Sequence, residues 1–89
     1  MPDDMGQDLI PQLLRPRKRL RTVMLIFPNF LVNEVGAKCI ELCDGTRTLK
    51  QIIDAISTEY EMDKEIIEKD IALFFKELEE LGLIRWKKD

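Results

Sequence analysis

Histidine is absent from this chain of 89 residues. Its absence removes the most common general base and the most common side-chain ligand for transition metals. The remaining residues contain no Ser–His or Cys–His pair, no phosphate-binding glycine loop and no complete set of metal ligands. We therefore expect a protein that is not an enzyme and that has no catalytic residues, no metal and no cofactor.

Cysteine is scarce as well, with only Cys39 and Cys43 in the chain. Two cysteines do not form a disulfide framework, and two thiolates without histidine make a poor metal site. Because they are four residues apart, they share one face of a predicted helix. We predict that both are small buried apolar side chains.

Long hydrophobic runs are also lacking. The longest, Val23 to Phe27, is far shorter than the ~20 residues that span a bilayer. The first residues, Met1-Pro2-Asp3-Asp4, are acidic where a secretory signal needs basic residues. We expect a soluble cytoplasmic protein that is a monomer and makes no membrane contact, and the length allows one domain.

The net charge of -3 gives no general attraction to nucleic acid. The charge is unevenly distributed, since residues 15–21 hold five cations and no acid, whereas residues 61–80 hold eight acids and three lysines. The basic segment is either solvated charge or a docking site for an acidic leader or enzyme surface. The acidic segment is typical of a solvated helix face.

Three prolines, Pro2, Pro11 and Pro16, interrupt the start of the chain. No sustained period is present there, so we predict an irregular N-terminal arm over residues 1–18. At most, a short turn of helix forms within residues 8–14. The folded domain is expected over residues 19–89.

Two strands are predicted after this arm. Residues 19–27 contain an unbroken apolar run, which suggests a strand covered on both faces. Pro28-Asn29 is a turn signal, and residues 30–32 are the second strand of a hairpin.

Three helices follow, and each has a capping residue at its start: Asn33, Thr48 and Asp63. Gly45 and Gly82 terminate the first and third helices. Residues 83–86 offer a further short strand. The apolar stripes of the second and third helices comprise Leu49, Ile52, Ile53, Ile56 and Tyr60, then Ile67, Ile71, Phe74, Leu78 and Leu81. The predicted fold is α+β and winged-helix-like, with a small N-terminal antiparallel sheet of two to three strands followed by three helices.

Several short segments resemble the PqqD-like family. The most specific is Leu42-Cys43-Asp44-Gly45-Thr46-Arg47-Thr48, in which residue types and spacing agree over seven positions. The other segments are Phe27-Pro28, Leu31-Val32-Asn33-Glu34, Asp70-Ile71 and Leu78-Glu79-Glu80-Leu81-Gly82-Leu83-Ile84. The resemblance covers about two thirds of the chain.

The resemblance implies a three-stranded N-terminal sheet and a role in recognising precursor peptides. Family members hold the leader of a ribosomally made peptide for a modifying enzyme, often a radical S-adenosylmethionine enzyme. The family usually has two strands before the proline at position 28. Here the region is short, so the first strand either lies in the arm, near Leu13-Leu14, or is missing.

The leader is expected to add as a strand to a sheet edge, where it satisfies unpaired backbone N–H and C=O groups. The short strand at 30–32 is the candidate edge, and the third helix is the candidate groove wall. The alternative is that these apolar residues belong only to the core. The predicted peptide-binding residues are Phe30, Leu31, Val32, Asn33, Ile67, Asp70, Ile71 and Phe74.

Two other functions remain open at this point. A winged-helix DNA-binding regulator would place a helix in the major groove, but the acid excess on the third helix opposes contact with phosphates. A scaffold subunit would bind the enzyme and ignore the peptide. The family is broad, so the resemblance alone assigns no role in the synthesis of pyrroloquinoline quinone (PQQ).

Overall fold

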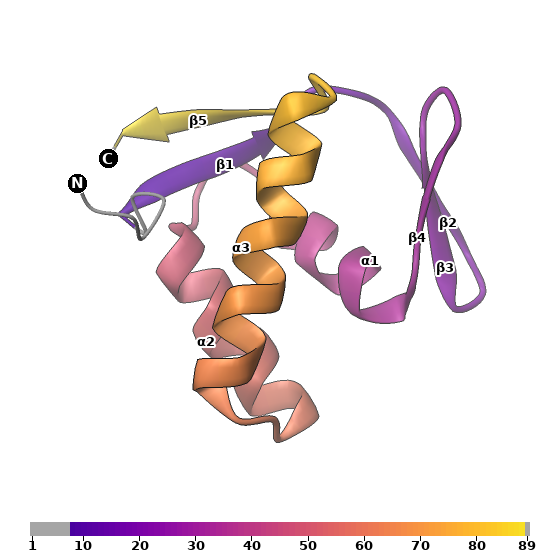
Figure 1. Cartoon of the computed structure of the whole chain (residues 1–89). Coiled ribbons are helices and arrows are strands. Elements are labelled where there is room, and N and C mark those ends of the chain that lie inside the picture. The colour runs from indigo at the N-terminus through magenta and orange to yellow at the C-terminus, as the bar shows by residue number, and fades with distance from the viewer. Residues whose placement is uncertain (1–7, 89) are drawn as a thin grey trace.

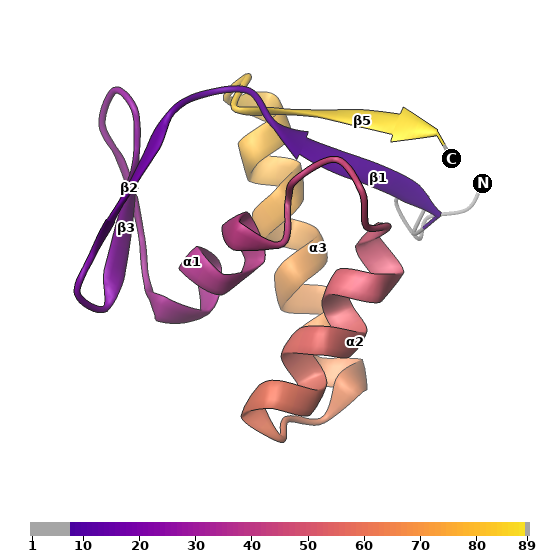
Figure 2. The same cartoon turned by 180° about the vertical axis from the view of Figure 1, so that it is seen from behind.

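The computed structural model describes residues 8–88. Three helices pack between two small antiparallel sheets at opposite ends of this region (Figures 1 and 2). The predicted α+β class is therefore confirmed. In chain order the elements are β1 (Leu9–Leu13), β2 (Arg17–Leu20), β3 (Val23–Ile26), β4 (Phe30–Val32), α1 (Glu34–Glu41), α2 (Leu49–Tyr60), α3 (Lys64–Glu80) and β5 (Ile84–Lys88).

One sheet joins the two ends of the described region. Strand β1 pairs antiparallel with β5, from Leu9 opposite Lys88 to Leu13 opposite Ile84. The predicted irregular arm is thus wrong for β1, and the short helical turn considered there is wrong as well. Strand β1 forms because its backbone pairs with β5. That partner lies more than 70 residues further along the chain, so the local sequence does not reveal the strand. Residues 1–7 of the predicted arm lie outside the described residues.

The other sheet has the strand order β2-β3-β4. The single strand predicted over 19–27 is in fact two strands, with a turn at Arg21-Thr22. Strands β2 and β3 therefore both precede Pro28, and with β4 they form a three-stranded sheet. The first strand of this sheet is not missing, as the short region had allowed. The hairpin predicted around Pro28-Asn29 is confirmed by the pairing of β3 with β4.

Strand β3 is covered mainly on one face. Met24 and Ile26 are buried, whereas Val23 and Leu25, which alternate with them, are only half-buried. This alternation arises because α1 packs against one side of the sheet (Figure 1). The expectation that both faces of this strand are covered is therefore met on one face and only partly on the other.

The three predicted helix caps are confirmed. The Asn33 side chain accepts the backbone N–H of Gly36 at 2.8 Å, and the Asp63 side chain accepts that of Glu65 at 2.9 Å. Thr48 and Gln51 form a complete capping box at the start of α2. The stop at Gly82 is confirmed, since this glycine follows the C-cap of α3 with a φ of +76°. The stop at Gly45 is wrong, because α1 already ends at Glu41 and Gly45, with a φ of +85°, lies in the loop that leads to α2.

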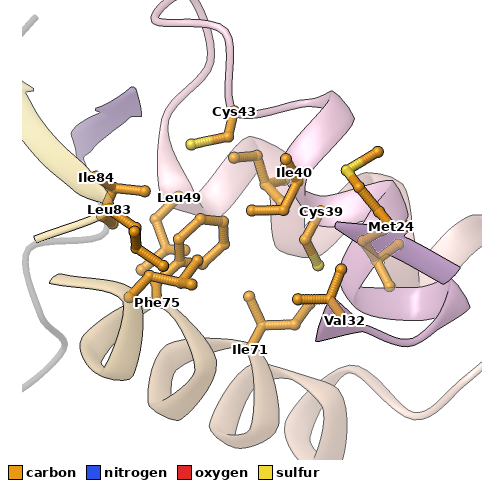
Figure 3. Packing of buried hydrophobic residues seen from close by; sticks show 14 of the residues in the cluster. Met24, Val32, Cys39, Ile40, Cys43, Leu49, Ile71, Phe75, Leu83 and Ile84 are labelled. Carbon is orange, nitrogen blue, oxygen red and sulfur yellow. The ribbon is translucent and has the colours of Figure 1, made fainter. Parts of the chain in front are cut away.

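The core lies where α3 crosses α1 and α2, beneath β3 and β5 (Figure 3). Phe75 and Leu78 of α3 are fully buried there. Cys39 and Cys43 are buried as predicted, and burial raises the pKa of each thiol to about 12. Across residues 8–88, no helix is long and apolar enough to cross a bilayer.

Candidate functional site

A groove of about 420 Å³ opens between β4, the start of α1 and one face of α3. Its size falls in the range of ~300–1,000 Å³ that is usual for ligand sites. The lining is mostly apolar. It consists of Phe30, Leu31, Val32, Asn33, Val35, Gly36, Cys39, Met62, Ile67, Asp70, Ile71, Phe74 and Glu77.

All eight residues proposed from the sequence line this one groove. Val32, Ile67 and Ile71 are buried and form its floor. Phe30 and Phe74 are half-buried and form its walls. The three exposed residues at the rim are Leu31, Asn33 and Asp70.

Strand β4 forms one long side of the groove. It pairs with β3 through Phe30, Leu31 and Val32, and it is the last strand in the order β2-β3-β4. Within the described residues, the outer row of backbone N–H and C=O groups of β4 therefore faces no further strand. Such an edge can take up an extended peptide by main-chain hydrogen bonding.

Asn33 lies at the groove but has a structural task. Its side-chain oxygen accepts the Gly36 N–H and so begins α1 immediately after β4. The cap fixes the direction in which α1 leaves the sheet, and it orients the rim of the groove. This oxygen already has a partner without any ligand.

Gly36 permits the close approach of α1, β4 and α3 at the base of the groove. A Cβ at this position would lie 3.1 Å from Val32 Cβ and 3.3 Å from Phe74 Cζ. The Phe74 ring is in turn held edge-on against Phe75, with ring centroids 5.6 Å apart. The groove wall is thus packed against the core.

The charges of the groove are all of one sign. Among the described residues that line it, Asp70 and Glu77 are the only carboxylates, and none is a lysine or an arginine. Asp70 and Glu77 are seven residues apart and so share one helical face, which means Glu77 was recognisable from the sequence. Three further lining residues, Val35, Gly36 and Cys39, could have been proposed because they belong to the helix that directly follows β4. Met62 lies in the loop before α3, and nothing in the sequence marks it as a groove residue.

Some cations of the basic segment 15–21 already contact other residues of the domain. Arg17 donates to the backbone oxygen of Ile40 at 2.9 Å, and Arg19 pairs with Glu41. Both contacts hold the end of α1, where cations are favourable. Two of the five cations therefore have a structural role.

The turn that carries the most specific resemblance lies away from the groove. Asp44 pairs with Arg47 at 2.9 Å. Hydrogen bonds from Thr46, followed by the Arg47 charge, lower the pKa of Asp44. The segment 42–48 shapes the link between α1 and α2 and does not line the groove.

Known proteins similar to this chain identify its family. The family model described as "Coenzyme PQQ synthesis protein D (PqqD)" matches residues 21–84. The chain belongs to the PqqD family. The match runs from the turn before β3 to the first residue of β5. It therefore includes every residue that lines the groove and leaves out β1 and β2.

Curated relatives agree with this assignment. The chain is 31% identical over 67 residues to the "PqqA binding protein" of Rhodopseudomonas palustris strain TIE-1 and 30% identical to that of strain BisB5. Each alignment covers 74% of this chain and 66% of the relative, which is just under two thirds of its length. No solved structure matches the chain significantly.

Proposed function

We propose that this chain binds the leader of a ribosomally made precursor peptide as an added strand on β4 and presents it to a modifying enzyme. The observation that carries the proposal is the free edge of β4 running beside an apolar groove whose far wall is α3. The name of the relatives, PqqA binding protein, supports a peptide as the ligand. The expected partner enzyme is a radical S-adenosylmethionine enzyme.

Strand addition accounts for both parts of the site. The backbone of the peptide bonds to β4, which supplies affinity for any extended sequence. Every second side chain of the peptide then points toward α3, because side chains alternate along a strand. Phe30, Ile71 and Phe74 offer apolar contact to those side chains and thus supply selectivity.

The first experiment locates the bound peptide. The amides of the ¹⁵N-labelled chain are followed during titration with synthetic leaders encoded next to its gene. We expect the signals of β4 and of residues 67–74 to move. The β1–β5 sheet serves as an internal control, because it lies on the opposite side of the helices from β4 in both views (Figures 1 and 2).

The second experiment tests the mode of binding. Single backbone N-methyl groups are placed at successive positions of the bound peptide. A strand donates toward its neighbour only from alternate residues, so affinity should fall at every second position and change little between them. A uniform loss along the peptide, or a loss with a helical period, would show that the peptide does not add as a strand.

The third experiment concerns the enzyme. Modification of the precursor by its radical S-adenosylmethionine enzyme is measured with and without this chain. We expect the chain to accelerate modification of the full precursor but not of a core peptide that lacks the leader. Acceleration of both substrates would instead identify a scaffold that ignores the leader.

A further inference from the structure

The acidic rim of the groove defines a chemical preference that strand addition alone does not. Asp70 and Glu77 stand on α3 about 10.5 Å apart along the helix axis, since each residue rises ~1.5 Å. Within residues 8–88, neither carboxylate has an ion pair or a side-chain hydrogen bond to a cation. The nearby lysines of α3 leave them unpaired.

Exposed apolar side chains accompany these carboxylates. Ile66 and Leu73 are 60% and 66% exposed. They lie four residues before Asp70 and three after it, so they share its helical face. Beside the groove, α3 therefore alternates between exposed apolar and acidic side chains along two turns.

A long basic side chain fits such a rim better than any other type. Lysine and arginine place an apolar stem against hydrocarbon while the charged head reaches a polar group. On a peptide strand paired with β4, groove-facing residues recur about every 6.8 Å. This spacing, together with flexible stems of several carbons, lets one basic residue reach either carboxylate, or two basic residues reach one carboxylate each.

We infer that the groove selects an extended peptide segment whose groove-facing side chains combine large apolar residues with lysine or arginine. This inference rests on the proposed function and adds the class of sequence that is bound. Apolar residues of the segment contact Phe30, Ile71 and Phe74. Its basic residue pairs with Asp70 or Glu77.

The test uses three synthetic nine-residue peptides. They carry threonine at alternate positions, leucine and phenylalanine at two groove-facing positions, and lysine, glutamine or glutamate at the groove-facing position between them. Binding of each fluorescein-labelled peptide is measured by anisotropy at 20 mM and 500 mM salt. We expect the lysine peptide to bind at least tenfold more tightly than the glutamate peptide at low salt, with the glutamine peptide between them. The ratio should shrink at high salt, because solvent-accessible ion pairs are screened.

Variants of the chain assign the preference to the two carboxylates. Asp70→Asn together with Glu77→Gln should weaken the lysine peptide about two- to fivefold for each site and remove most of the difference between the peptides. Asp70→Lys with Glu77→Lys should reverse the order. Glu79→Gln removes a single carboxylate charge of α3 outside the groove, and it should leave the order intact.

The outcomes separate this inference from the proposed function. If gene-encoded leaders move the signals of β4 and α3 but the lysine and glutamate peptides bind equally, the charge preference is wrong and leader binding stands. A preference that survives in the Asp70→Asn/Glu77→Gln variant also overturns the inference. If neither the leaders nor any of the three peptides bind, both proposals fail.

Discussion

Replacing Gly36 by alanine should weaken peptide binding while leaving the fold intact. The added Cβ would sit 3.1 Å from Val32 Cβ and 3.3 Å from Phe74 Cζ. Carbon atoms in good contact are ~3.5–4.0 Å apart, so β4 and the Phe74 ring must give way by several tenths of an ångström. The ring can turn, but its free space is the groove. The Val32 Cβ is fixed to the backbone of β4 and can move only with that strand.

Two opposing energies set the effect on stability. Alanine is better than glycine in a helix by at most about 1 kcal/mol, and Gly36 is in the first turn of α1, where this gain is reduced. Overpacking typically costs about 1–3 kcal/mol. The free energy of unfolding should therefore fall by about 0–2 kcal/mol. Peptide affinity should fall at least about fivefold, which corresponds to ~1 kcal/mol of lost contact.

Urea unfolding and fluorescence titration with a bound leader measure these two effects. The matched control is Ala55→Gly, an opposite change at an exposed position of α2. It should lower the free energy of unfolding by about 1 kcal/mol through helix propensity alone and leave peptide affinity unchanged. A Gly36→Ala chain that gains stability and binds the leader as the wild type does would refute the close approach at the groove floor.

Three further predictions concern stability. Asn33→Ala removes the side-chain acceptor 2.8 Å from a backbone N–H of α1, and urea unfolding should show a loss of about 1 kcal/mol. Gly45→Ala should lower the free energy of unfolding more than Gly82→Ala does in the same assay. Both glycines have a positive φ, which costs roughly 1–2 kcal/mol for alanine. Only a Cβ at position 45 would also meet a side chain of β1, at 3.3 Å. Burial raises the pKa of the Cys39 and Cys43 thiols to about 12, well above the usual value for a thiol. Their neutral forms thus stabilise the fold below pH ~9, and this contribution is lost as the pH rises toward 12. Urea midpoints between pH 8 and 10.5 should fall more steeply in the wild type than in a double Cys→Ala chain, by up to about 1.4 kcal/mol per pH unit for each thiol.

The helices could be predicted from the sequence because their signals are local. A cap such as Thr48 acts on N–H groups within three residues, and the periodic apolar positions lie on the same element. The structure finds the three N-terminal caps and the stop at Gly82 where the sequence placed them, whereas the first helix ends at Glu41, before Gly45. No information from distant parts of the chain was needed.

The strands were harder to predict because their partners are distant or their turns unmarked. Strand β1 contains Pro11 and shows no alternation, and only pairing with β5 makes it a strand. The turn at Arg21-Thr22 has no glycine, proline, asparagine or aspartate to mark it. A strand pair fixed by tertiary contacts leaves little trace in either segment alone.

The composition and the local sequence do not predict which residues meet in the groove. Phe30 and Phe74 are separated by more than 40 positions, and their meeting depends on how α3 crosses the sheet. The family resemblance supplied that arrangement. Glu77 was missed even though Asp70 was proposed, because the apolar stripe rather than the whole helical face was used to choose residues.

Whether an apolar residue of α3 serves the core or the site is decided by the width of its apolar face. The buried residues Ile67, Ile71, Phe75 and Leu78 already form a stripe sufficient for the core. Phe74 extends this stripe toward β4, and Ile66 and Leu73 extend it further into solvent. A surface helix in a small domain gains nothing in solubility from such exposure. Phe74 lines the groove together with β4, and Asp70 and Glu77 are the two charged residues among the described residues that line it, so we propose that a bound peptide covers this wide face of α3.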